Sequence, residues 1–224
     1  YQAAVVCSES DAAVIREQSP QAEILVVANG ADLTQFTPVD NPPSGPPTLL
    51  YVGSMYYYPN VDAVKYFFEH CWAAIQAAVP EVQVQIVGHQ PPSEIQALGE
   101  LPGVMVTGSV PDVRPYYQSA TALIVPLRLG GGTRLKIVEA MAMGVPVIST
   151  SVGAEGLSVV PDENIVIADS AVAFVRQTVR VLQDAVLRER LKVGGRTLAQ
   201  RYDWTALAQP YVELVARLAG SDRA

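Results

Sequence analysis

One stretch of the chain, residues 122–157, constrains the fold more than any other: ALIVPLRLGGGTRLKIVEAMAMGVPVISTSVGAEGL. It begins with a continuous apolar run, 122–126, which is typical of a parallel strand covered on both faces. An almost wholly apolar helical segment follows, and Gly144 suits the left-handed position that ends many helices. Residues 145–150 form a second apolar run. The stretch therefore predicts a buried strand, a glycine loop, a helix and a second buried strand.

The loop between the first strand and the helix predicts an anion site. It contains three consecutive glycines, 130–132, whose backbone can turn sharply and expose its N–H groups, and Thr133 can cap the helix. Free N–H groups and the positive end of the dipole converge at a helix N-terminus, and Arg134 and Lys136 add positive charge in the first turn. Glu139 lies nearly two turns in. It is placed for a hydroxyl-bearing group attached to that anion, such as a ribose.

A simpler interpretation of these residues is structural. The glycines could form a flexible loop, and Lys136 with Glu139 could be a surface pair that contributes only a few tenths of a kcal/mol. Against this, the charges lie on a helix that is otherwise apolar, where an unpartnered charge is costly. The balance favours a binding site.

The segment GGGTRLKIVEAMAMGVPVISTSVGAEGL resembles the nucleotide-sugar-binding segment of retaining GT-B glycosyltransferases, in particular family 4, the glycosyl transferases group 1. The resemblance implies that Glu139 holds the donor ribose and that Lys136 grips the diphosphate with Arg134 as a helper. Many members place a further glutamate, which contacts the donor sugar, where this chain has Gly131. Backbone amides of the loop would take over that contact. The candidate diphosphate residues are Gly131, Gly132, Thr133, Arg134 and Lys136.

Other glycine turns resemble the family's cleft-forming turns. GSMYYYPNVDAV is similar to the turn that faces the donor pocket, with Gly53 and Ser54 directly after a predicted strand. Gly88 and His89 end the next strand, and Val110 lies where the family contacts the base through main-chain groups. This chain lacks the Arg and Lys that many relatives have after the first of these strands. The resemblance therefore assigns more of the phosphate binding to Arg134 and Lys136.

The tyrosine run 56–58 has two interpretations. Tyrosines at a binding cleft can stack on sugar rings, whereas tyrosine-rich loops more often cover a core. We favour the second interpretation, a lid over the core.

The size and composition of the chain exclude several classes of protein. A net charge of −7 over 224 residues argues against a nucleic-acid-binding surface, which needs clustered positive charge. No uninterrupted apolar stretch reaches the roughly 18–20 residues that span a bilayer. Cys7, Cys71, His70 and His89 are too scattered for a metal site. We therefore expect free buried thiols in a reducing compartment and no metal, in a cytoplasmic protein whose full-length form can contact a membrane peripherally.

Strand and helix patterns predict an α/β, Rossmann-like parallel sheet with helices on both faces. The predicted strands of this sheet are 48–52, 82–87, 104–107, 122–126, 145–150 and 164–168. Helices are predicted over 59–78, 113–120, 171–182 and 185–201, in addition to the central helix. Glycine turns follow the carboxyl ends of the strands, which is where ligands bind in such sheets.

The remaining parts of the chain predict a four-part organisation. Residues 1–37 resemble the tail of an N-terminal domain and its hinge strand, through the run VVANGADLTQFTP, with a helix opened by a Ser8 capping box. Residues 38–47 contain five prolines and predict a linker. Residues 48–202 are the nucleotide-sugar-binding domain. Residues 203–224 resemble the family's C-terminal crossing helix, which we expect Pro210 to kink.

The resemblance implies that the chain is the donor-binding half of a glycosyltransferase. Such an enzyme moves a sugar from a nucleoside diphosphate sugar (a UDP- or GDP-sugar or similar) to an acceptor hydroxyl of a glycan or lipid, without a metal or other cofactor, because the helix dipole and cations stabilise the leaving group. Catalytic acceptor-side groups would belong largely to the N-terminal domain, so this chain alone should bind donor but turn over poorly. A sugar-nucleotide epimerase of GT-B fold and a non-catalytic nucleotide-sugar-binding module remain open.

Overall fold

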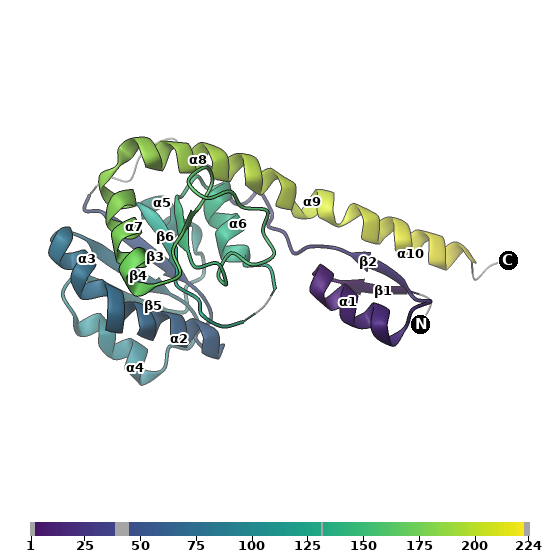
Figure 1. Cartoon of the computed structure of the whole chain (residues 1–224), viewed down its shortest axis with the longest axis horizontal. Coiled ribbons are helices and arrows are strands. Elements are labelled where there is room, and N and C mark those ends of the chain that lie inside the picture. Colours follow the sequence, from purple (N-terminus) through teal and green to yellow (C-terminus); the bar gives the residue numbers. More distant parts are fainter. Residues whose placement is uncertain (1–2, 39–44, 131, 222–224) are drawn as a thin grey trace.

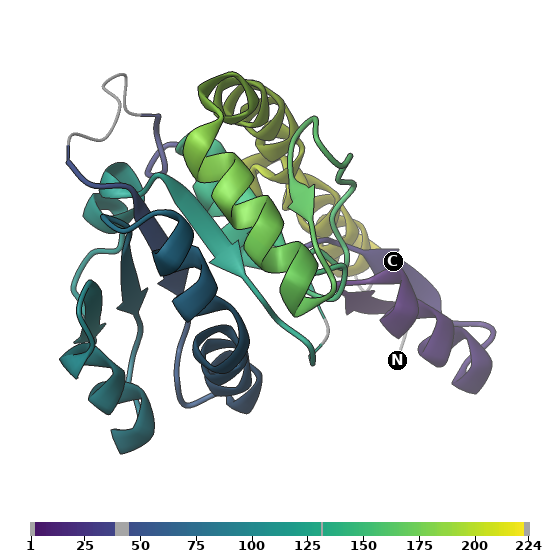
Figure 2. The same cartoon turned by 60° about the vertical axis from the view of Figure 1, so that its left-hand side comes forward.

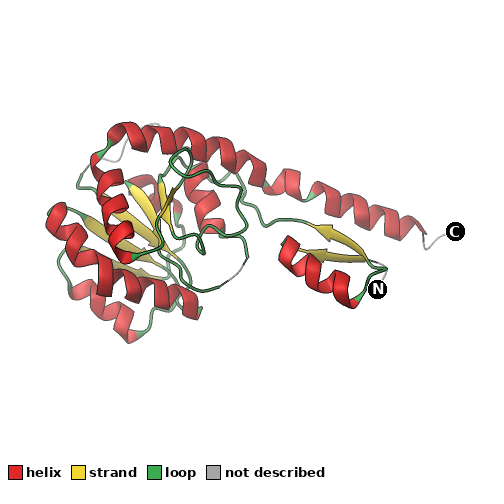
Figure 3. Ribbon diagram, viewed as in Figure 1, coloured by secondary structure: helices red, strands yellow, loops and turns green. Residues whose placement is uncertain are grey.

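The main part of the protein is a six-stranded, wholly parallel sheet (Figures 1 and 3). The computed structural model describes residues 3–38, 45–130 and 132–221. The strand order is β5-β4-β3-β6-β7-β8, as in the doubly wound fold. The six predicted strands and the fold class are thus confirmed. The strands are β3 (Thr48–Val52), β4 (Gln83–Val87), β5 (Val104–Gly108), β6 (Ala122–Val125), β7 (Val147–Ser149) and β8 (Val166–Ile167).

Helices cover both faces of this sheet. One layer contains α2 (Tyr58–Phe67), the π-helical turn η1 (Phe68–Trp72), α3 (Ala73–Ala78) and α7 (Ala171–Gln183), which lie side by side in Figure 2. Phe67 and Phe174 join α2 to α7 with ring centroids 6.3 Å apart. The other layer contains α5 (Arg114–Ser119), α6 (Leu135–Ala142) and α8 (Ala185–Ala199). Every residue of β6 is buried between the two layers, as its continuous apolar run predicts.

The order in which successive strands are added to the sheet reverses between β3 and β6. These two strands are neighbours, with Leu49 opposite Ala122, although some 70 residues separate them in sequence. From β3 the sheet extends one way through β4 and β5, and from β6 it extends the other way through β7 and β8. A crevice at the carboxyl ends of β3 and β6 is the expected ligand position in a sheet of this kind.

The central helix α6 starts later than the residue types suggest, and it ends where they predict. The prediction that Thr133 caps it is wrong, because the helix begins at Leu135 and Arg134 occupies the capping position without a side-chain cap. At the other end, Gly144 has φ of +75°, as predicted. Gly144 N donates to the Met141 carbonyl and Val145 N to the Ala140 carbonyl, the bond pair of a Schellman motif.

The helix predicted over 59–78 is continuous but not uniform. The π-helical turn η1 inserts one extra residue between α2 and α3, which shifts the helical register so that Cys71 and Trp72 are both buried. Two short helical segments between β4 and β5 escaped prediction: α4 (Ser93–Gln96) and the 3₁₀ turn η2 (Ala97–Glu100). Of the two free cysteines, Cys71 is buried as expected, whereas Cys7 is exposed.

A small unit at the N-terminus stands apart from the main sheet (Figure 1). It consists of β1 (Ala3–Val6), α1 (Glu9–Gln18) and β2 (Glu23–Val26), and β1 pairs parallel to β2. Ser8 caps α1 by accepting a hydrogen bond from Asp11 N at 3.1 Å, as the capping box predicts. Residues 39–44 of the proline-rich segment lie outside the described residues.

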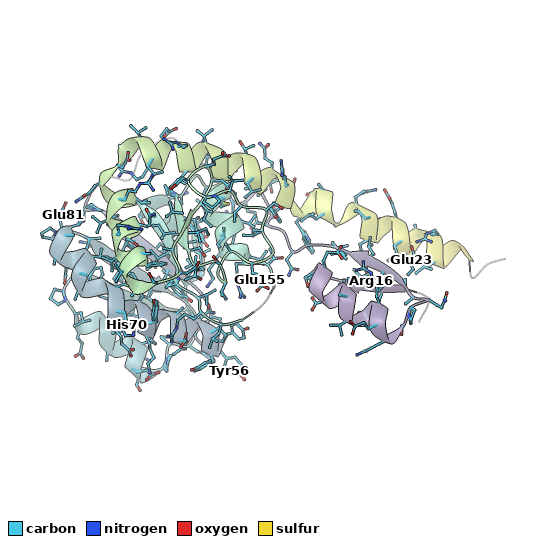
Figure 4. All side chains as sticks on the ribbon, viewed as in Figure 1. Arg16, Glu23, Tyr56, His70, Glu81 and Glu155 are labelled. Carbon is cyan, nitrogen blue, oxygen red and sulfur yellow. The ribbon has the colours of Figure 1, made fainter. Side chains whose placement is uncertain are left out.

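The C-terminal segment connects the small unit to the main sheet. After α8 come the 3₁₀ turn η3 (Gln200–Tyr202), α9 (Trp204–Leu207) and α10 (Gln209–Ser221). Ala31 N donates to the Tyr202 carbonyl at 2.9 Å, and Trp204 N donates to the Ala31 carbonyl at 3.0 Å. Arg217 on α10 pairs with Glu23, which Figure 4 shows on the small unit. The expected break near Pro210 falls at Ala208, ahead of the proline, which lies in the first turn of α10.

No helix within the described residues is long and apolar enough to cross a membrane.

Candidate functional site

The candidate site lies at the carboxyl ends of β3 and β6. The loop after β6 is on the side of the main sheet that faces the small N-terminal unit (Figures 1 and 2). The turn after β3 approaches it closely: a Cβ atom added at Gly53 would lie 2.8 Å from Lys136 Nζ. A side chain at this position would force the Lys136 ammonium or the Asn60 amide to shift. The structure thus brings the first glycine turn and the central helix together, as the sequence predicts.

Lys136 is held by an amide rather than by a carboxylate. Its Nζ donates to Asn60 Oδ1 at 3.0 Å and lies 4.5 Å from the centre of the Tyr51 ring, a cation–π geometry. No ion pair joins Lys136 to Glu139 among the residues that the structure describes, so the surface-pair interpretation is wrong. The lysine is anchored from β3 and α2, and no carboxylate in the described part of the chain contacts its ammonium.

The surroundings of Lys136 lower its pKa, so that its side chain is only partly protonated near neutral pH. Burial and, to a lesser extent, the positive charge of Arg134 lower the pKa of Lys136 to about 7, although the negative charge of Glu139 opposes both effects. An anion bound beside the ammonium would stabilise the charged form. The position therefore gains a full charge when an anion arrives.

Glu139 also has a neutral partner. Tyr117 on α5 donates from its hydroxyl to Glu139 Oε2 at 2.9 Å. Burial raises the pKa of Glu139, and the Tyr117 hydrogen bond and the charge of Lys136 counteract it. The other oxygen, Oε1, accepts no hydrogen bond from the described part of the chain. A carboxylate with one oxygen anchored and one available can accept a bond from a ligand hydroxyl.

Arg134 lies beneath the glycine loop. Its side chain is nearly buried, with 9% exposed, and a Cβ atom at Gly130 would lie 3.1 Å from Arg134 Nη2. Gly130 has φ of +100°, a conformation that favours glycine. Arg128, which precedes the glycine loop, forms an ion pair with Asp62 on α2 at 2.5 Å. Arg134 and Lys136 are the cations that lie at the start of α6.

Gly132 and Thr133 form the end of the glycine loop, before α6. Gly132 is exposed with φ of +83°, and Thr133 is half-buried. The loop after β7 packs against Thr133, since a Cβ atom at Gly156 in that loop would lie 3.7 Å from Thr133 Oγ1. Gly131 lies outside the described residues.

The turns after β3, β4 and β5 are tied to one another by the backbone. Gly53 N donates to the Val87 carbonyl at 3.0 Å, Met55 N to the His89 carbonyl at 2.8 Å, and Gly88 N to the Gly108 carbonyl at 3.2 Å. A Cβ atom at Gly88 would lie 1.8 Å from the Gly53 carbonyl oxygen, which excludes any larger residue. The predicted cleft residues Gly53, Ser54, Gly88, His89 and Val110 therefore share one edge of the sheet.

Comparison with known proteins identifies the family of this chain. The family model described as glycosyl transferases group 1 matches residues 46–184, more than half of the chain. The chain belongs to the glycosyl transferases group 1. Phosphatidyl-myo-inositol mannosyltransferase of Mycobacterium tuberculosis (strain CDC 1551 / Oshkosh) is 27% identical to it over 208 residues. That match covers 87% of this chain and 54% of the relative, so the chain spans about half the length of the relative.

Solved structures share the fold over almost the whole chain. Sucrose-phosphate synthase from Thermosynechococcus elongatus superposes with a TM-score of 0.77 and 25% identity, covering 97% of this chain and 58% of the synthase. The pneumococcal O-GlcNAc transferase GtfA, solved with UDP and GlcNAc, has a TM-score of 0.74 and 15% identity over 96% of this chain and 45% of its own. At that identity the second likeness shows the fold alone.

The tyrosine run of this group 1 chain is not a lid. Tyr56, Tyr57 and Tyr58 are 84%, 48% and 66% exposed, so the favoured interpretation is wrong. Figure 4 shows Tyr56 at the outer edge of the main unit. The core beneath is closed by Met55 and Pro59 instead, which flank the run and are buried.

Three site residues of this group 1 chain escaped prediction: Tyr51, Asn60 and Tyr117. Asn60 and Tyr51 are buried and hold Lys136, while Tyr117 is fully buried and holds Glu139. Tyr117 lies in the helix predicted over 113–120, and nothing in that helical pattern indicates a role beyond packing. Asn60 stands in the PN pair of the turn motif GSMYYYPNVDAV, which is the one signal that could have marked it.

A metal centre has no support in the described residues, where no three His, Cys, Asp or Glu side chains come together. His89 is exposed and its Nδ1 is 2.6 Å from Ser109 Oγ.

Proposed function

We propose that this chain is the donor-binding half of a glycosyltransferase. The enzyme moves a sugar from a nucleoside diphosphate sugar to an acceptor hydroxyl of a glycan or lipid, with retention of configuration and without a metal. In the reaction the bond from the anomeric carbon to the diphosphate oxygen breaks, and a bond to the acceptor oxygen forms. The acceptor hydroxyl loses its proton, and the diphosphate leaves with the bonding electron pair.

The observation that carries the proposal is Lys136 at the β3–β6 crevice with a neutral partner. An ammonium over a buried tyrosine ring, at the start of a helix and next to Arg134, offers positive charge where the leaving diphosphate gains negative charge. Arg134, Gly131, Gly132 and Thr133 supply further donors to the diphosphate. Glu139 accepts from the ribose hydroxyls, and the turns at Gly53, Ser54, Gly88, His89 and Val110 surround the base.

The domain organisation is part of the proposal. Residues 1–37 are the tail of an N-terminal domain and its hinge strand, 38–47 a linker, 48–202 the donor-binding domain, and 203–224 the crossing helix. Two separate sheets and the pairing of Ala31 with the C-terminal segment support this division. We place the protein in the cytoplasm, which two free cysteines support, with the full-length form in peripheral contact with a membrane if the acceptor is a lipid.

Calorimetry of the 224-residue chain against UDP-, GDP-, ADP- and dTDP-sugars tests donor binding and identifies the base. We expect one donor to bind, and to bind equally well with EDTA. Binding that disappears with EDTA and returns with manganese or magnesium would contradict metal independence. Failure of every donor to bind would contradict the function itself.

Product analysis with the full-length protein separates the proposed reaction from its alternatives. A glycosyltransferase yields a new glycoside and a nucleoside diphosphate. An epimerase yields an altered sugar, and a binding module returns the donor unchanged.

A further inference from the structure

We infer that Asn60 is a positioning residue that holds the Lys136 ammonium in the crevice with a neutral acceptor, so that the ligand's diphosphate is the anion that meets the charge. This inference rests on the proposed function for its ligand. Asn60 lies in the first turn of α2, which follows β3, whereas Lys136 lies in the first turn of α6, which follows β6, so the contact exists only because these strands are neighbours.

Every polar atom of the Asn60 side chain has a partner. Oδ1 accepts from Lys136 Nζ at 3.0 Å and from the Tyr51 hydroxyl at 2.8 Å, and Nδ2 donates to the Ser54 carbonyl at 2.8 Å. The side chain is 8% exposed. The bond to Ser54 fixes which end of the amide faces the lysine, because the end that donates to a carbonyl must be nitrogen. The oxygen is therefore directed at Lys136 by the turn itself.

The neutrality of this acceptor matters for binding. A carboxylate at the same place would form an ion pair with Lys136 and would also repel a diphosphate. An amide oxygen gives the ammonium a fixed position through a single bond, and it leaves the net positive charge intact. Tyr51 is a second neutral partner. Its ring attracts the ammonium, and its hydroxyl donates a hydrogen bond to Asn60 Oδ1.

Among the residues that the structure describes, four charged or titratable groups surround Lys136. They are Arg134 in the preceding loop, Glu139 on its own helix, Tyr51 on β3 and Tyr117 on α5, whose hydroxyl contacts the Lys136 carbonyl at 3.3 Å. Both tyrosines stay neutral, because burial raises the pKa of each above its usual value. Besides Lys136 itself, the charged groups here are Arg134 and Glu139. Replacing Asn60 by aspartate thus adds a second negative charge beside the lysine.

The deciding variant is Asn60→Asp, measured by calorimetry with UDP and with uridine. We expect affinity for UDP to fall at least about tenfold, because the new carboxylate neutralises Lys136, and affinity for uridine to stay within about twofold. A matched control is Asn164→Asp. Asn164 is equally buried, at 8% exposure, and its Oδ1 accepts a hydrogen bond from Val160 N at 2.8 Å. It precedes β8, the edge strand, and so lies away from β3 and β6. The control should leave both affinities unchanged.

A second variant, Asn60→Ser, covers the case in which aspartate prevents folding. Serine is too short to hold Nζ, so UDP binding should weaken by about three- to tenfold with uridine unaffected. In a Lys136→Ala background the same change should add nothing, because Asn60 acts through Lys136. An equal further loss in that background would overturn the positioning role.

A titration without ligand separates this inference from the proposed function. NMR of the lysine side-chain carbons should show the Lys136 pKa rising by about one to three pH units in Asn60→Asp. An unchanged pKa, or UDP affinity equal to wild type in both Asn60 variants, would overturn the role of Asn60. A wild-type chain that binds none of UDP, GDP and ADP would instead contradict the proposed function, and the NMR result would still decide whether Asn60 controls Lys136.

Discussion

Charged side chains are satisfied differently on the outer surface and in the crevice. On the surface, charges meet opposite charges: Lys65 Nζ lies 3.0 Å from Glu94, and Arg114 Nε lies 2.9 Å from Asp112. In the crevice, Lys136 is held by the amide of Asn60. Glu139, three residues along the same helix, is held by a tyrosine hydroxyl.

This difference distinguishes charges that are neutralised by a partner within the fold from charges whose partners are neutral and that can therefore still bind an oppositely charged or polar ligand. An ion pair leaves little net charge for a third group, whereas a hydrogen bond to a neutral partner fixes position without neutralising. Burial of Lys136 and Glu139 without an opposite charge in contact lowers the free energy of unfolding of the ligand-free protein. The loss is recovered when an anion and a hydroxyl group bind.

The largest expected effect comes from Lys136→Ala. Measured at about pH 6, where the lysine is charged, nucleoside diphosphate affinity should fall by about 2–5 kcal/mol, because a desolvated charge contact is lost. Nucleoside affinity should change little. Calorimetry of both ligands with wild type and variant gives the result. An unchanged preference for diphosphate over nucleoside would remove the distinction between crevice and surface charges.

Glu139→Ala comes next. Loss of charge-assisted bonds to the ribose should cost about 1–3 kcal/mol of donor affinity, provided that circular dichroism shows the variant to be folded. The wild-type chain should also discriminate against a 2′,3′-dideoxyribose analogue. If it binds that analogue as well as the parent nucleotide, Glu139 does not recognise the ribose.

The parts of the fold that depend on local pattern were predictable from the sequence. Continuous apolar runs marked the buried parallel strands, and Gly144 marked the end of α6, because only backbone conformation and burial decide them. The start of α6 was not predictable from residue preference. The helix begins at Leu135, and Arg134, a residue with no preference for capping, occupies the N-cap position without a side-chain hydrogen bond.

The candidate site was predictable in its charged residues and not in their partners. Lys136 and Glu139 stand out on an apolar helix, and a family resemblance assigns them ligands. Their partners come from other elements: Asn60 and Lys136 are 76 positions apart in the sequence, and Tyr117 and Glu139 are 22 positions apart. Such contacts depend on which strands become neighbours and at what register. No local pattern carries that information.

A smaller effect is expected in the pH dependence of stability. The folded-state pKa of Lys136 is about 7, below its ordinary value of 10.5, so between these values the unfolded chain holds a proton that the folded chain does not. Hence the contribution of Lys136 to the free energy of unfolding rises with pH across this window and is least favourable below it. Urea unfolding of wild type and Lys136→Met at several pH values tests this. The variant should lose that part of the rise, and identical slopes would show that Lys136 has an ordinary pKa when folded.

The smallest expected effect is at the surface pair of Lys65 and Glu94. The side chains of both are about half exposed, and the hydrogen bond to Glu94 raises the pKa of Lys65, so this lysine remains charged throughout the neutral range. Solvent and salt screen such a pair, and the lysine lies on α2 with its charge already matched. Lys65→Ala removes the same ammonium group as Lys136→Ala but should leave the melting temperature and nucleoside diphosphate affinity near wild type, at low and at high salt. A comparable loss of affinity in both variants would mean that diphosphate binding follows the overall charge of the chain, and the neutral partners in the crevice would then have no special role.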